Sequence, residues 1–205
     1  MRSFFAFLAL ALLGAAPRSD AGLIGDASVP YRAERTVWVN GQSYSGAVMS
    51  EPGHQRHDQT LFGLPEVFLL DTASAKGFLV LPSVKTYLEF PFPPLMAELD
   101  AKDLLRDPVG QDKVAGLAAT KYRVDHTARD GSRAEGFLWL ARGGILVKLD
   151  VAVTRAHGGR PMHVAMELSD LVRGPVDPAL FVLPQGYARL PVGALAPLLG
   201  GKPPS

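Results

Sequence analysis

The chain has 205 residues, of which 21 are basic, 20 are acidic and none is cysteine. This near-neutral charge lacks the basic footprint of nucleic-acid binding proteins and the polybasic runs that bind anionic lipid headgroups. Without cysteine the chain has neither disulfides nor lipid attachment at a cysteine, so an apolar core must stabilise the fold.

The first 21 residues have the pattern of a secretory signal peptide. A positive start precedes the apolar run Phe4–Ala16, which is short for a membrane span, and Ser19-Asp-Ala21 is a small-x-small cleavage site. The alternative, an uncleaved membrane anchor, is disfavoured because small residues follow the run. Two arginines and one aspartate leave with the signal, so 19 basic and 19 acidic residues remain. We therefore expect a periplasmic protein, secreted by a cleaved signal peptide and not lipidated.

Residues 22–190 are predicted to form one domain, and its first part has alternating strand patterns. Tyr31–Val39 is the first strand, Asn40-Gly41 is a type I′ turn signal, and Tyr44–Met49 is the returning strand. The segment His54–Thr60 is strongly polar, and we expect it at a sheet edge, where charge discourages pairing with other chains.

The middle of the chain holds short apolar strands and one amphipathic segment. Glu66–Leu70, Gly77–Leu81 and Lys85–Phe90 are predicted strands. Pro94–Asp107 has a proline suited to a first helical turn and an apolar stripe opposite charged residues. This segment is the best helix candidate and is expected to cover one face of the sheet.

The clearest pattern in the chain lies between Phe137 and Leu171. Ile145–Arg155 alternates with a period of two, and the strands Phe137–Leu140 and Met162–Leu168 flank it through glycine-containing turns. Three such strands form an antiparallel meander. With about ten strands in total, the sequence predicts a mainly β (α+β) fold: a curved antiparallel sheet forming an unclosed β-barrel covered by one or two helices. Residues 191–205 are predicted to be a flexible apolar tail rich in proline and glycine.

No catalytic or metal-binding pattern is found. His54 and His57 are three residues apart on a predicted strand, so they point to opposite faces, and the five histidines are expected at the surface. The serines of the segment 41–46 lack the strand-to-helix turn that exposes a catalytic serine. We therefore predict no enzyme activity, no catalytic residues, no metal and no cofactor.

Aromatic residues occur on nearly every predicted strand. They indicate either an ordinary core or a curved sheet enclosing an apolar pocket, and the sequence alone leaves both open. If there is a pocket, the inward side chains of the meander and of the helix would line it. The candidate lining residues are Met96, Leu99, Phe137, Trp139, Val147, Leu149, Val151 and Met166.

The order of motifs between Tyr31 and Tyr187 resembles the periplasmic LolA/LolB-like outer-membrane lipoprotein carrier superfamily, in its uncharacterised branches. The motifs are Asn40-Gly41, Leu79-x-Leu-Pro82 with Lys85-x-Tyr87, Gly136-Phe-Leu-Trp139, and the closing Phe181-x-x-Pro184-x-Gly186-Tyr187. The resemblance implies an unclosed barrel with helices over an apolar cavity that holds acyl chains. The arginine that lies in the cavity of the carriers matches no position in this sequence.

The resemblance implies a periplasmic protein that binds a lipid or lipoprotein acyl chain, in lipoprotein or lipid trafficking. The alternative is an envelope protein-interaction or stress-sensing module with the same fold and no ligand, and a hydrolase is the least favoured alternative. The expected partners are an acyl chain and an envelope protein, and a monomer without nucleic acid is expected.

Overall fold

The structure is a computed structural model that describes residues 27–61, 63–92, 108–156 and 158–191. Twelve strands form one sheet in the order β12-β6-β5-β4-β3-β2-β1-β11-β10-β9-β8-β7. The elements are β1 (Tyr31–Val39), β2 (Gln42–Glu51), β3 (His54–Leu61), β4 (Leu64–Asp71), β5 (Lys76–Leu81), η1 (Pro82–Val84), β6 (Thr86–Pro91), β7 (Pro108–Val114), β8 (Leu117–Thr127), β9 (Arg133–Ala141), β10 (Ile145–Thr154), β11 (Met162–Arg173), η2 (Pro178–Phe181) and β12 (Ala188–Arg189).

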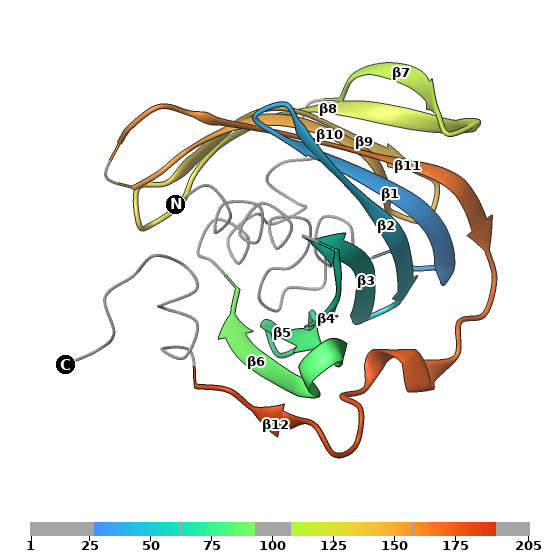
Figure 1. Cartoon of the computed structure of the whole chain (residues 1–205). Helices are drawn as coiled ribbons and strands as arrows, with labels where there is room; N and C mark the ends of the chain where they lie inside the picture. The colour runs from blue at the N-terminus through green and yellow to red at the C-terminus, as the bar shows by residue number, and fades with distance from the viewer. Residues whose placement is uncertain (1–26, 62, 93–107, 157, 192–205) are drawn as a thin grey trace.

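The sheet curls strongly but does not close (Figure 1). Neighbouring strands are antiparallel, except that β12 runs parallel to β6. The predicted unclosed antiparallel half-barrel is thereby confirmed, and the architecture is consistent with a LolA-like fold. Within the described ranges the only helical elements are the short 3₁₀ turns η1 and η2. The predicted helix Pro94–Asp107, the predicted signal peptide 1–21 and the predicted tail from residue 192 lie outside the described residues.

The hairpin between β1 and β2 follows from its two turn residues. Asn40 and Gly41 have φ values of 49° and 83°, as a type I′ turn requires. The register then pairs Val39 with Gln42 and runs without interruption to Tyr31 and Ser50. This turn and the bounds of the first strand were both predicted from the sequence and are confirmed.

The meander of β9, β10 and β11 is also confirmed. Its central strand β10 pairs antiparallel with both neighbours. The register with β9 shifts between Leu146 and Lys148, which is a β-bulge. The apolar residues that alternate along β10 are all buried: Ile145, Val147, Leu149, Val151 and Val153.

The position of β3 corrects the sequence prediction. This polar strand lies between β2 and β4 in the interior of the sheet, not at an edge. Gln55, His57 and Gln59 are only 2%, 3% and 8% exposed. Polar side chains tolerate burial when they hydrogen-bond to one another, so their polarity does not by itself indicate an edge.

The segment after β11 returns along the outside of the sheet. Asp177 caps η2 by accepting a hydrogen bond from the Ala179 amide at 2.9 Å. Arg56 on β3 donates to the Leu180 carbonyl at 3.1 Å. A small outer core forms beneath this segment from Val67, Leu69, Val80, Phe78, Tyr87, Leu183 and Tyr187.

No helix in the described part of the chain is both long and apolar enough to cross a membrane.

Candidate functional site: a buried polar cluster on the concave face

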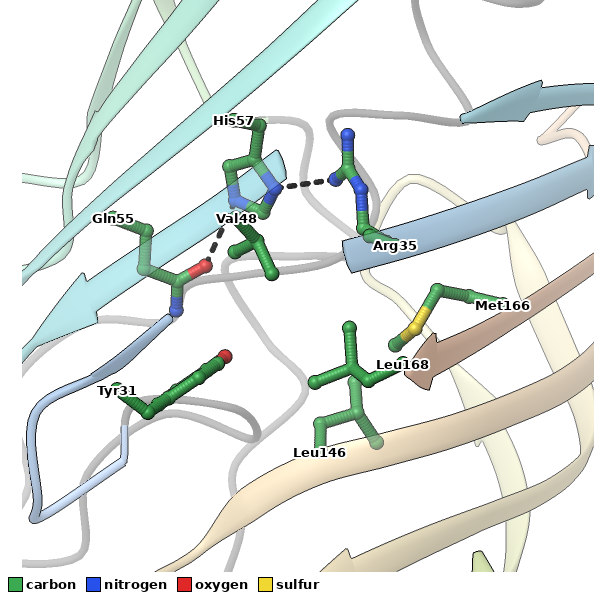
Figure 2. A pocket seen from close by; sticks show the side chains of 8 residues that line it. All are labelled: Tyr31, Arg35, Val48, Gln55, His57, Leu146, Met166 and Leu168. Carbon is green, nitrogen blue, oxygen red and sulfur yellow. Dashed lines mark hydrogen bonds between the residues drawn. The ribbon is translucent and has the colours of Figure 1, made fainter. Parts of the chain in front are cut away.

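Strand register places a polar cluster on the inner face of the sheet. Arg35 of β1 lies opposite Leu168 of β11, while His57 and Gln55 of β3 lie opposite Val48 and Ser50 of β2. Directly opposed residues of antiparallel strands share a face. Their side chains meet those of β10 and β11 around one cavity (Figure 2), so this face is the concave one.

The Arg35 cluster, defined as Arg35, His57 and Gln55, is a chain of hydrogen bonds. Arg35 donates from Nη1 to His57 Nδ1, and His57 Nε2 donates to Gln55 Oε1 at 3.1 Å. Because the guanidinium is only a donor, His57 must accept at Nδ1 and carry its proton on Nε2. Arg35 and His57 are each 3% exposed, so water contributes little to their hydrogen bonding.

Burial governs the charge of this cluster. Burial lowers the pKa of Arg35 to about 10, an effect that Tyr31 partly opposes, so Arg35 remains a cation at neutral pH. The pKa of His57 lies well below its ordinary value, first because of burial and second because of the charge on Arg35. The cluster therefore holds one positive charge, and the lowered arginine pKa corresponds to a cost of about 3 kcal/mol for burying it.

Arg35 also has an unsatisfied donor. Its Nε is buried and makes no hydrogen bond, and no carboxylate of the described residues forms an ion pair with its guanidinium. An unpaired buried donor costs about 1–3 kcal/mol, and more when it is charged. Such a group in a folded protein requires an explanation, and a ligand is one of the few available.

A second polar pair continues along the same face. Gln59 of β3 lies opposite Glu66 of β4 and donates to its carboxylate at 3.1 Å. Burial raises the pKa of Glu66, and the hydrogen bond from Gln59 opposes that rise. The Gln59 side-chain oxygen is buried without a partner. The inward side chains of β3 are thus polar from Gln55 through His57 to Gln59.

Apolar surface flanks this polar strand on both sides. Toward β1, β11 and β10, the register places Val37, Met166 and Leu149 side by side. Toward β4, β5 and β6 it aligns Phe68, Leu79 and Leu88. All of these side chains are buried, at 8% exposure or less. The concave face is consequently amphipathic, with a polar stripe between two apolar fields.

The cavity at the Arg35 cluster is small. It measures about 10 Å³, room for a single water-sized group. Its lining residues are Tyr31, Arg35, Val48, Gln55, His57, Leu146, Met166 and Leu168. Among the described residues that line the cavity, Arg35 is the only cation and the other seven are neutral.

The lining residues predicted from the sequence divide into groups. Leu149, Val151 and Met166 lie on the concave face, and Met166 borders the cavity. Val147 is fully buried at the bulge of β10. Met96 and Leu99 lie outside the described residues. Whether any of them contacts a ligand stays a prediction.

The prediction that Phe137 and Trp139 point inward is wrong, because both side chains lie on the outer face of the sheet. They are opposite Asp150 and Lys148 on β10 and opposite Arg123 and Lys121 on β8. Lys121 Nζ lies 4.0 Å from the Phe137 ring centroid and 4.9 Å from that of Trp139. Lysine side chains cover these rings on the outer face, where Trp139 is buried and Phe137 is half-buried.

Sequence reasoning missed Arg35 and misplaced His57. The histidines were expected at the surface, and His54 and His163 do have side chains that are 45% and 57% exposed, but His57 is buried. A signal for Arg35 is present: it occupies the same parity as the buried Tyr31 and Val37. A charged residue on an apolar parity is the pattern that would have identified it.

Among the residues that the structure describes, no group of three or more histidine, aspartate or glutamate side chains is arranged to hold a metal ion.

Comparisons with known proteins relate the chain to solved structures alone. No protein-family model matches, and no curated protein matches. An uncharacterized conserved protein from Thermus thermophilus aligns with a TM-score of 0.52 and 11% identity, over 91% of this chain and 98% of that one. At this identity the likeness shows a shared fold and nothing about function.

Two structures of MucB align less well. MucB in complex with MucA(peri) gives a TM-score of 0.48 and 16% identity over 82% of this chain, which spans 59% of the MucB chain. The Pseudomonas aeruginosa MucA/MucB complex gives a TM-score of 0.47 and 17% identity, over 76% of this chain and 56% of that one.

Proposed function

We propose that this protein is a periplasmic lipid-binding protein that holds the acyl chain of a lipid or lipoprotein on the concave face of its half-barrel, without catalysis. The observation that carries the proposal is the amphipathic concave face. Apolar fields flank a buried, incompletely paired polar stripe, and apolar walls with a few convergent polar groups are typical of ligand sites. The motif resemblance to the LolA/LolB-like superfamily supports the same function, including a role in lipoprotein or lipid trafficking.

Acyl-chain binding requires the concave side to expand. The cavity of about 10 Å³ is far below the roughly 300–1,000 Å³ of ordinary small-molecule sites. An empty apolar cavity of that larger size would cost several kcal/mol, at about 24 cal/mol per Å³. A protein of this kind is therefore expected to open its binding space only as the ligand enters.

The test is to identify both the ligand and its position. Native mass spectrometry of the full-length protein purified from its own periplasm is expected to show an acyl-bearing species. A photoreactive fatty acid is expected to label the concave residues Leu149, Val151 and Met166, and to leave the outer Phe137 and Trp139 unlabelled. Absence of any acyl species together with labelling confined to the outer face would refute the proposal.

A second candidate is a protein-interaction module without a lipid ligand, which the position of β7 at the end of the described sheet favours. This strand ends the sheet, and six of its seven residues are exposed. Exposed edges of this kind bind partner strands by β-augmentation. If an envelope protein co-purifies in a manner that depends on β7, and no lipid does, the second candidate replaces the first.

A further inference from the structure

The cavity beside β3 contains a buried cation that no residue of the described chain neutralises. Arg35 uses Nη1 for His57, while Nε has no acceptor. Figure 2 shows Arg35 and His57 turned toward each other at one end of the cavity, with Leu146, Met166 and Leu168 at the other. The cavity is therefore polar at one end and apolar at the other, as the head of an amphiphile would require.

The geometry of the guanidinium restricts what that head group is. With Nη1 committed to His57, the edge formed by Nε and Nη2 is the one that remains for a ligand. Two parallel N–H groups on a planar fork match the two oxygens of a carboxylate. The cavity of about 10 Å³ also favours a small group over a bulky one.

Charge complementarity points the same way. Arg35 is the only cation among the described residues that line the cavity, and His57 is neutral because its Nδ1 accepts a hydrogen bond from Arg35. One positive charge balances a monoanion, whereas a phosphate dianion would retain an unpaired charge in an apolar setting, which is unfavourable.

We propose that the Arg35 cluster is the head-group end of the binding site and takes a carboxylate, that of a long-chain fatty acid. The inference rests on the proposed acyl-chain function for the chain portion of the ligand. The carboxylate accepts from Nε and Nη2 of Arg35, while His57, itself oriented by Gln55, holds the guanidinium through Nη1.

The experiment compares amphiphiles that differ only in their head. Full-length protein is titrated calorimetrically with oleate and with oleyl alcohol. Oleate is expected to bind about 10- to 100-fold more tightly, the range for a hydrogen-bonded charge pair. Arg35→Leu is expected to reduce oleate binding to the level of the alcohol. Arg32→Leu removes an exposed arginine of the same strand and is expected to leave the ratio unchanged.

Folding is checked by circular dichroism and thermal melting. If Arg35→Leu does not fold, Arg35→Lys takes its place, because lysine keeps the charge but lacks the planar fork. Its oleate preference is expected to fall by about tenfold, the lower end of the range for one charged hydrogen bond. The head-group assignment is overturned if wild type binds oleate and oleyl alcohol equally well, or if neither substitution changes the ratio of the two affinities. Binding of the acyl chain itself would still stand.

A short carboxylate separates the two proposals when neither amphiphile binds. Butyrate is then added while the Arg35 Nε–H resonance is followed by NMR. A shift in wild type, together with the loss of butyrate binding in Arg35→Leu, supports a carboxylate site and refutes acyl binding. No shift overturns both the site and the proposed function.

Discussion

Gly46 of β2 lies against the backbone of Asp58 and Gln59 in β3, and replacing it tests how the polar stripe is positioned. A Cβ at this position would lie 1.9 Å from the Asp58 carbonyl oxygen, 2.9 Å from the Asp58 carbonyl carbon and 3.0 Å from the Gln59 Cα. All three atoms are backbone, so no side-chain rotation relieves the overlap. Because Cβ atoms essentially never come closer than 3.0 Å to another heavy atom, Gly46→Ala must move β3 away by about 1 Å. The two strands would then lie further apart than the usual spacing of about 4.8 Å.

The expected loss is large. Overpacking costs about 1–3 kcal/mol, and each ladder hydrogen bond lost nearby costs about 1 kcal/mol. We expect Gly46→Ala to lower the free energy of unfolding by about 3 kcal/mol, which for a chain of this size lowers Tm by about 6–12 °C. Thermal melting followed by circular dichroism measures it. Because Asp58 lies between His57 and Gln59, the NMR signals of the Arg35 cluster should shift as well.

Gly110→Ala is the matched control. It lies in β7 with nothing within 4 Å of its Cβ position and no positive φ, so the same substitution is expected to change stability by less than about 0.5 kcal/mol. At about 2–4 °C per kcal/mol, the control should melt within about 2 °C of wild type. If Gly46→Ala also melts within about 2 °C of wild type, β2 and β3 do not approach as described, and the reasoning is refuted.

Three further predictions concern titration and the outer core. The pKa of His57 is lowered in the folded state, so the unfolded chain binds the extra proton and wild type loses stability as pH falls below about 6.5, by up to about 1.4 kcal/mol per pH unit. His57→Gln, which can still accept from Arg35, should flatten urea-unfolding stability between pH 7 and pH 5, and an unchanged slope would contradict this. The raised pKa of Glu66 gives the opposite pH dependence. Its contribution to the free energy of unfolding is fully present below the ordinary carboxyl pKa, where the side chain is protonated, and is lost as pH rises. Glu66→Gln should therefore unfold at higher urea than wild type at pH 7, because its amide also offers a donor to the unpaired Gln59 oxygen; a lower midpoint would count against a buried carboxylate. Tyr187→Ala should remove about 1–2 kcal/mol of outer-core packing and speed proteolysis after β11, whereas an unchanged cleavage rate would show that this segment is not held by its side chains.

Features encoded by neighbouring residues could be predicted from the sequence. The alternation of Tyr31–Val39, the positive-φ pair Asn40-Gly41 and the parity of β10 depend on local geometry alone. A succession of such hairpins is sufficient to indicate a curved antiparallel sheet. The half-barrel was therefore within reach of sequence reasoning.

The polar interior was not within reach, because it depends on pairing between distant residues. His57 is buried because Arg35, 22 positions earlier and two strands away, donates to it. Nothing in the polar stretch around His57 distinguishes internal hydrogen bonding from exposure to water. The prediction for Phe137 and Trp139 was wrong for a related reason. The bulge in β10 shifts the register so that Trp139 lies opposite Lys148 on the outer face, where lysines contact the rings.

The order of strands has a consequence for how the chain folds. Every antiparallel pair joins strands that are consecutive in the chain, apart from β1 with β11, whose paired residues lie between 125 positions (Val39 and Val164) and 142 positions (Tyr31 and Arg173) apart. Strands β1–β6 and β7–β11 can each assemble from local contacts, which form quickly, whereas closing the long loop between β1 and β11 is slow. Until β11 is available, one edge of β1 has no partner and invites pairing with other chains. Joining the two halves is thus the expected rate-limiting step of folding, and a chain truncated before β11 is expected to aggregate.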